Sequence, residues 1–116
     1  MNIRNFLEAQ LEDCGNMHDG IGILKHKTLF GGSDFSTSIN FLNYTILPPD
    51  TTIGVHTHGN DEELYIVLEG EGEMQVDGEL REVSAGDIIL NKPFGTHGLE
   101  NHSDKDIKIL VIGISG

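Results

Sequence analysis

The chain has 116 residues, of which 37% are hydrophobic and 22% charged, and this size and composition predict one compact domain with a single core. Seven Lys and Arg against nineteen Asp and Glu give a formal net charge of −12, which argues against binding to nucleic acid or to an anionic membrane surface. No apolar run is long enough to span a bilayer, and the N-terminus lacks a signal pattern, so we expect a cytoplasmic protein.

The N-terminal segment is expected to form a short amphipathic helix over residues 3–14. Apolar side chains recur there at helical spacing from Ile3 to Cys14, and Gly15 follows where a helix would end. Cys14 is the only cysteine, so it cannot form an internal disulfide. We expect it to be a small buried side chain.

From residue 23 onward, short β-rich runs alternate with glycine-bearing turns. The runs predict nine strands, at about 23–29, 38–47, 53–57, 62–69, 72–77, 79–83, 87–91, 96–101 and 106–114. The strongest turn signal is Asp77-Gly78, because both residues tolerate the positive φ of a type I′ hairpin. Nine short strands without a linker or an internal repeat predict one all-β sandwich or small barrel over residues 1–116.

Two histidines, His56 and His58, lie two residues apart in one predicted strand. Strand residues i and i+2 point to the same face, so both imidazoles can reach one ion. Glu63 opens the next strand, and His97 follows the turn Pro93-Phe94-Gly95. Three imidazoles and one carboxylate can bind Mn, Fe, Co, Ni or Zn and leave positions for water or substrate.

These residues resemble the two motifs of the cupin superfamily. The first motif reads here His56-Thr57-His58-Gly59-Asn60-Asp61-Glu62-Glu63, followed by Gly70. In the second motif Gly86, His97 and Asn101 hold the family's mutual spacing, whereas Pro93 and Gly95 lie one position later than usual. The resemblance covers about residues 39–112.

The resemblance implies a double-stranded β-helix, or jelly-roll barrel, that holds a divalent transition metal in its interior. The metal ligands that it implies are His56, His58, Glu63 and His97. Small single-barrel cupins are often dimers, and a homodimer is therefore expected here.

Only one of Glu62 and Glu63 can face the histidines, because successive strand residues point to opposite faces. The alternation of side chains along the strand favours Glu62 as the inward-facing residue, because it shares a face with the apolar residues Leu64, Ile66 and Leu68. The six-residue spacing to the motif glycine favours Glu63, and we adopt it. The three apolar residues then form an outward stripe that the N-terminal strands or a second subunit must cover, which also favours a dimer.

Tyr65 shares a face with Glu63 and is the candidate catalytic residue. Its hydroxyl can orient a substrate oxygen or act as a general acid, and core packing with a satisfied hydroxyl is the alternative. His18, His26 and His102 match no motif and are not expected in the site.

The predicted function is that of a small metal-dependent cupin enzyme acting on a small polar, sugar-like or carboxylate-like metabolite. The resemblance allows isomerisation or epimerisation, decarboxylation and dioxygenation, and the sequence does not choose among them. A non-catalytic barrel that binds or senses a small ligand is the alternative. A structural protein whose surface binds a partner is a third possibility.

Overall fold

The computed structural model describes all 116 residues and contains ten strands and two short 3-10 segments. The strands are β1 (Glu12–Gly15), β2 (Ile23–Gly31), β3 (Ile39–Leu47), β4 (Thr52–Thr57), β5 (Asp61–Glu69), β6 (Glu71–Val76), β7 (Glu79–Ser84), β8 (Ile88–Asn91), β9 (Thr96–Glu100) and β10 (Ile107–Ser115). The 3-10 segments are η1 (Met17–Asp19) and η2 (Gly32–Asp34). The nine strands predicted from residue 23 onward are therefore confirmed, with bounds that differ by at most two residues. No helix is long and apolar enough to cross a lipid bilayer.

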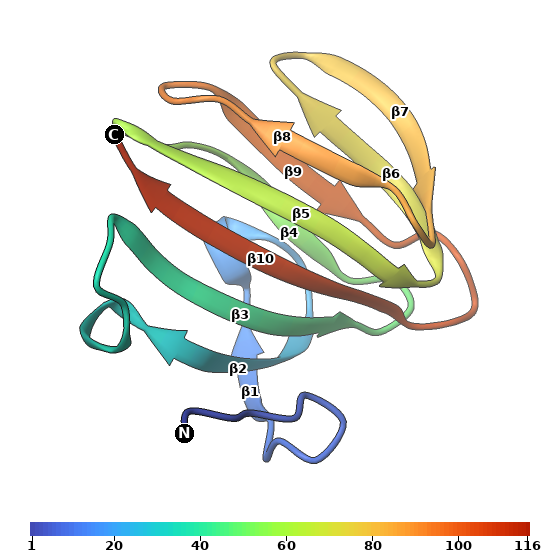
Figure 1. Cartoon of the computed structure of the whole chain (residues 1–116). Coiled ribbons are helices and arrows are strands. Elements are labelled where there is room, and N and C mark those ends of the chain that lie inside the picture. Colours follow the sequence, from blue (N-terminus) through green and yellow to red (C-terminus); the bar gives the residue numbers. More distant parts are fainter.

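Two antiparallel sheets face each other as a jelly roll (Figure 1). The six-stranded sheet has the order β1-β2-β3-β10-β5-β8, and the four-stranded sheet has the order β4-β9-β6-β7. A core of 11 buried side chains fills the space between them, with Leu24, Leu47, Ile107 and Ile109 fully excluded from solvent. The predicted double-stranded β-helix is confirmed.

The predicted helix over residues 3–14 is wrong. Residues 6–8 form a turn, and residues 12–15 form β1, in which Cys14 lies opposite Leu24 of β2. An isolated helix of this length is marginal in water, whereas the free edge of β2 offers backbone donors and acceptors to a neighbouring strand. Cys14 is half-buried in β1 rather than fully buried.

The hairpin between β6 and β7 turns at Asp77-Gly78, as expected. Both residues have positive φ, 49° and 83°, which is the conformation that a type I′ turn requires.

Strand β5 presents Glu63 to the interior together with Tyr65 and Val67, which are 3% and 2% exposed. Because the side chains alternate, the intervening residues point to the outer face of the six-stranded sheet. These half-buried residues are Leu64, Ile66 and Leu68. The N-terminal segment covers part of that outer face, where the ring of Phe6 lies 4.9 Å from that of Tyr44.

Candidate metal centre

A β-bulge in β4 turns the two motif histidines toward the interior. Ile53 pairs with Leu99 and His56 pairs with His97, so three steps along β4 match two steps along β9. The extra residue reverses the alternation of side chains within β4. Ile53 is 3% exposed and Val55 is 52% exposed, and after the bulge His56 and His58 face inward while Thr57 is exposed.

Gly54 lies at this bulge because η1 packs directly on its backbone. A Cβ atom at this position would overlap the carbonyl oxygen of His18 and would lie 2.8 Å from the amide nitrogen of Gly20. The amide of Thr52 also donates a 2.9 Å hydrogen bond to the carbonyl of Ile21, just after η1. These contacts seat η1 against β4 beside the histidines.

Three of the four expected ligands converge closely. His56, Glu63 and His97 each bring one ligand atom within 4.8 Å of the others. The rings of His56 and His97 have centroids 4.3 Å apart, and Nε2 of His97 lies 3.1 Å from Oε1 of Glu63. His58 lies next to this group, with its ring centroid 4.9 Å from that of His97, but its nitrogens are outside the 4.8 Å cluster. The motif glutamate that faces the imidazoles is therefore Glu63, not Glu62.

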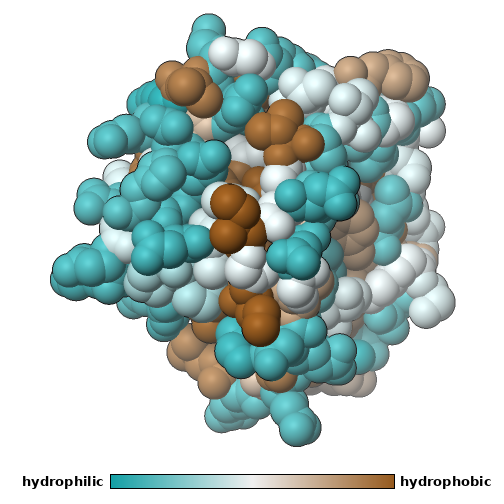
Figure 2. Space-filling model, turned by 180° about the vertical axis from the view of Figure 1, so that it is seen from behind, coloured by the Kyte–Doolittle hydropathy of each residue, from teal (hydrophilic) through white to brown (hydrophobic).

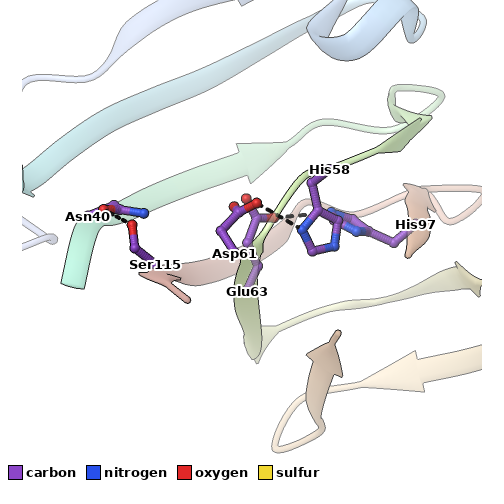
Figure 3. A network of polar contacts seen from close by, with 6 residues as sticks. All are labelled: Asn40, His58, Asp61, Glu63, His97 and Ser115. Atoms are coloured by element: carbon purple, nitrogen blue, oxygen red, sulfur yellow. Dashed lines mark hydrogen bonds and ion pairs between the residues drawn. The ribbon is translucent and has the colours of Figure 1, made fainter. Parts of the chain in front are cut away.

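The orientation of two imidazoles is set by partners at their Nδ1 atoms. His56 donates from Nδ1 to the carbonyl oxygen of Gly54 at 2.8 Å. His58 donates from Nδ1 to the carboxylate of Asp61 at 3.3 Å (Figure 3). Such partners hold the tautomer in which Nε2 carries a free lone pair, the form that binds a metal.

Several ring nitrogens of the candidate ligands have no hydrogen-bond partner, and this bears on whether these residues can bind a metal. Nε2 of His58 and both ring nitrogens of His97 are buried and make no hydrogen bond, although Glu63 lies close to His97. A buried polar atom without a partner is costly, and a divalent ion that accepts one lone pair from each imidazole removes that cost at the nitrogen that it binds. The nitrogen and carboxylate donors fit a borderline transition metal such as Mn, Fe, Co, Ni or Zn.

The electrostatics of the site keep two of its groups in the form that binds a cation. Burial lowers the pKa of the His56 imidazole and outweighs the opposing effect of its hydrogen bond to Gly54. Burial alone would raise the pKa of the Glu63 carboxyl. The contact with His97 and the charges of the neighbouring imidazoles outweigh burial, so this pKa lies below its ordinary value. At neutral pH the histidine is unprotonated and the glutamate ionised.

We expect metal affinity to be constant above about pH 7 and to fall as the pH drops through about 6 to 5, because imidazoles must lose their protons to bind. The lowered pKa values of His56 and Glu63 mean that protons compete there only at a pH below the ordinary values. The loss of metal therefore falls on the acid side of the usual imidazole range. Metal content after dialysis over a pH series measures it, and a content unchanged down to about pH 4.5 would contradict a three-histidine site.

A cavity of about 200 Å³ has Tyr65 and Glu63 in its wall. The end of this cavity beside Glu63, next to the other candidate metal ligands, is termed its metal end. The ring of Tyr65 packs edge-on against His97, with centroids 5.2 Å apart. Burial raises the pKa of its phenol, so the hydroxyl keeps its proton and can donate a hydrogen bond. This favours an orienting role for Tyr65 over that of a general acid, and its catalytic role stays a prediction.

Two histidines that the motifs did not indicate also line this cavity. The ring of His18 stacks on that of His56, with centroids 3.5 Å apart and an interplanar angle of 10°. His26, which belongs to β2, also lines the cavity. No local pattern marks either residue, because their place depends on where η1 and β2 pack. His102 lies outside the cavity, on the surface, paired with Glu100 at 2.7 Å.

The chain matches the family model of the cupin domain over residues 43–113, more than half of its length, and it belongs to the cupin family. It is 27% identical over 105 residues to an oxalate-binding protein of Thermotoga maritima, covering 90% of this chain and 87% of that protein. It is 40% identical over 65 residues to an uncharacterized protein of Methanocaldococcus jannaschii, covering 56% of this chain and 52% of that one.

Similarity to a solved structure extends over the whole barrel. The crystal structure of a predicted oxalate decarboxylase from Thermotoga maritima superposes with a TM-score of 0.95 at 25% identity. The superposition covers 98% of this chain and 99% of the other.

Proposed function

We propose that this cupin binds one divalent transition metal and, on that metal, a small carboxylate such as oxalate. The metal ligands in this proposal are His56, His58, Glu63 and His97. The observation that carries it is the set of buried, unpaired nitrogens of His58 and His97 beside Glu63. The oxalate-binding relative supports a carboxylate as the ligand.

The composition of the cavity supports a ligand that is held by the metal. Its wall contains no Lys or Arg, and its one acidic residue is Glu63. A free carboxylate would therefore meet no positive charge in the metal-free protein. A bound divalent ion supplies that charge as a Lewis acid, and the Tyr65 hydroxyl donates a hydrogen bond to a ligand oxygen. The volume of about 200 Å³ suits a metabolite smaller than a drug-sized molecule.

Oxalate binding should be strictly metal-dependent. We expect isothermal titration to show binding to manganese-loaded protein and none after the metal is removed with a chelator. A His97→Ala variant should fail to bind in both forms, because it lacks one ligand of the cluster. Equal binding with and without metal, or no binding with any of the five candidate metals, would contradict the proposal.

Decarboxylation of the bound carboxylate is a second candidate function. The protonated Tyr65 hydroxyl favours it, because it lies at the metal end of the cavity and can hold a carboxylate oxygen in one orientation. In oxalate, cleavage of the carbon–carbon bond releases carbon dioxide, and protonation of the other carbon yields formate. Formate production that falls in Tyr65→Phe at unchanged metal content would support this function, and no formate from any metal-loaded form would exclude it.

The outer face of the six-stranded sheet carries the proposed homodimer contact. Ile88 and Leu90 of β8 are 65% and 45% exposed, next to Ile66 and Leu64 of β5. Half-buried apolar residues of β10 continue the patch: Leu110 and Ile112. A contiguous apolar patch of this kind marks an interaction surface. The opposite side of the molecule instead shows separate apolar spots among hydrophilic side chains (Figure 2).

A lysine in this patch should dissociate the dimer. We expect Leu90→Lys to shift the mass measured by light scattering from two chains to one, because association would bury an unpaired charge. Leu80→Lys is the matched control, since Leu80 is 58% exposed on the other sheet. A wild type that is monomeric at micromolar concentration would contradict the proposal.

A further inference from the structure

The cavity has a second polar end, away from the candidate metal ligands. Across the six-stranded sheet, Asn43 of β3, Val111 of β10 and Tyr65 of β5 lie in one row. Two strand spacings separate Asn43 from Tyr65, about 10 Å along the sheet. Both residues line the same cavity, so one small ligand can reach from the metal end toward Asn43.

The side chain of Asn43 has an unused hydrogen-bonding atom. Its Oδ1 is buried and has no hydrogen-bond partner, although the residue lines the cavity. An unsatisfied buried acceptor costs free energy, and a donor brought by a ligand recovers it. A carboxylate such as oxalate has no hydrogen to offer, whereas a hydroxyl group has one.

The neighbours of Asn43 at this end carry no positive charge that would hold a second carboxylate. His26 and Thr45 face each other across β2 and β3, with Nδ1 of His26 2.9 Å from Oγ1 of Thr45. Burial lowers the pKa of the His26 imidazole and outweighs the opposing influence of Glu12, so the ring is neutral at pH 7. The cavity wall contains no Lys or Arg. This end therefore suits a neutral polar group.

From this arrangement we infer that the preferred ligand is a small hydroxycarboxylate, with its carboxylate at the metal end and its hydroxyl donating to Oδ1 of Asn43. The inference rests on the proposed metal-dependent carboxylate binding and adds the ligand's second functional group. Asn43 is then a specificity residue that does not take part in metal binding.

The test compares butanoate with 4-hydroxybutanoate, in titrations of manganese-loaded protein. Each acid has a single carboxylate, and they differ by one hydroxyl at the opposite end of the chain. We expect wild type to bind 4-hydroxybutanoate about tenfold more tightly, which corresponds to about 1.4 kcal/mol and lies in the range for satisfying one buried polar group. Asn43→Leu, of similar size, should reduce the preference to less than about twofold while butanoate affinity and metal content stay unchanged. Asn43→Ala serves as a second variant if the leucine impairs folding.

Thr28→Val is the matched control, because Thr28 lies opposite Asn43 on β2 but is exposed and outside the cavity. It should keep the wild-type preference. A preference that persists in the Asn43 variants would show that the hydroxyl binds the metal instead, and this would overturn the inference. Equal wild-type affinities for the two acids would overturn it while leaving the proposed function intact. If neither acid nor oxalate binds the loaded protein, both the inference and the proposed function fail.

Discussion

Glu63→Gln should lower metal affinity by at least about 100-fold and leave the barrel folded. Loss of a residue that only hydrogen-bonds to a metal ligand already lowers metal affinity about 10–100-fold. This substitution removes a proposed ligand's charge, which is the one negative charge among the four. Glu63 lies 3.1 Å from Nε2 of His97, inside the tight cluster with His56. Competition with a chromogenic chelator measures the affinity, and circular dichroism checks the fold.

Glu62→Gln is the matched control, one residue away on the same strand. Glu62 precedes the inward-facing residue and points to the other side of β5, so its charge does not reach the cluster directly. We expect its substitution to change metal affinity by less than about twofold, as is usual for a group that makes no specific contact. The reverse order of effects would show that the register of β5 differs from the one described.

Gly54→Ala should destabilise the protein and loosen the site together. The new methyl group would overlap the carbonyl oxygen of His18 and crowd the amide of Gly20, so η1 must move away from β4. Overpacking of this kind costs about 1–3 kcal/mol, which lowers Tm by roughly 4–12 °C in a chain of this size. Metal affinity should fall as well, because Nδ1 of His56 donates to the carbonyl of Gly54 and its ring stacks on His18.

Gly15→Ala isolates the effect of packing from that of replacing any glycine. A Cβ atom at Gly15 meets nothing within 4 Å, and its φ is not in the left-handed region. Calorimetry of the metal-free proteins should place this control within about 2 °C of wild type. Equal Tm values for the two variants would contradict the packing of η1 on β4.

Strand alternation alone assigned the wrong glutamate to the interior. The apolar residues Leu64, Ile66 and Leu68 of β5 suggested a core-facing side that included Glu62. They lie instead on the outer face, which is itself apolar and partly covered where Phe6 packs on Tyr44. A strand that is apolar on both faces does not reveal its orientation, so the motif spacing was the better guide.

Alternation also fails within β4, for a different reason. Strict alternation from the buried Ile53 would turn Val55 and Thr57 inward and His56 outward. The bulge reverses this order, and Gly54 is its only mark in the sequence. A glycine within a strand indicates an irregularity such as a bulge. It does not indicate that η1 packs against the strand, although that packing is what requires a glycine here.

The sequence by itself determined the succession of strands from residue 23 and the hairpin at Asp77-Gly78, and its resemblance to the two cupin motifs implied the barrel and the four candidate ligands. These features depend on local backbone preferences and on spacings within short segments. Only the tertiary structure decided that residues 12–15 pair as a strand and that His18 and His26 share a cavity with Glu63. Those outcomes depend on backbone pairing and packing between segments distant along the chain, which local periodicity does not encode.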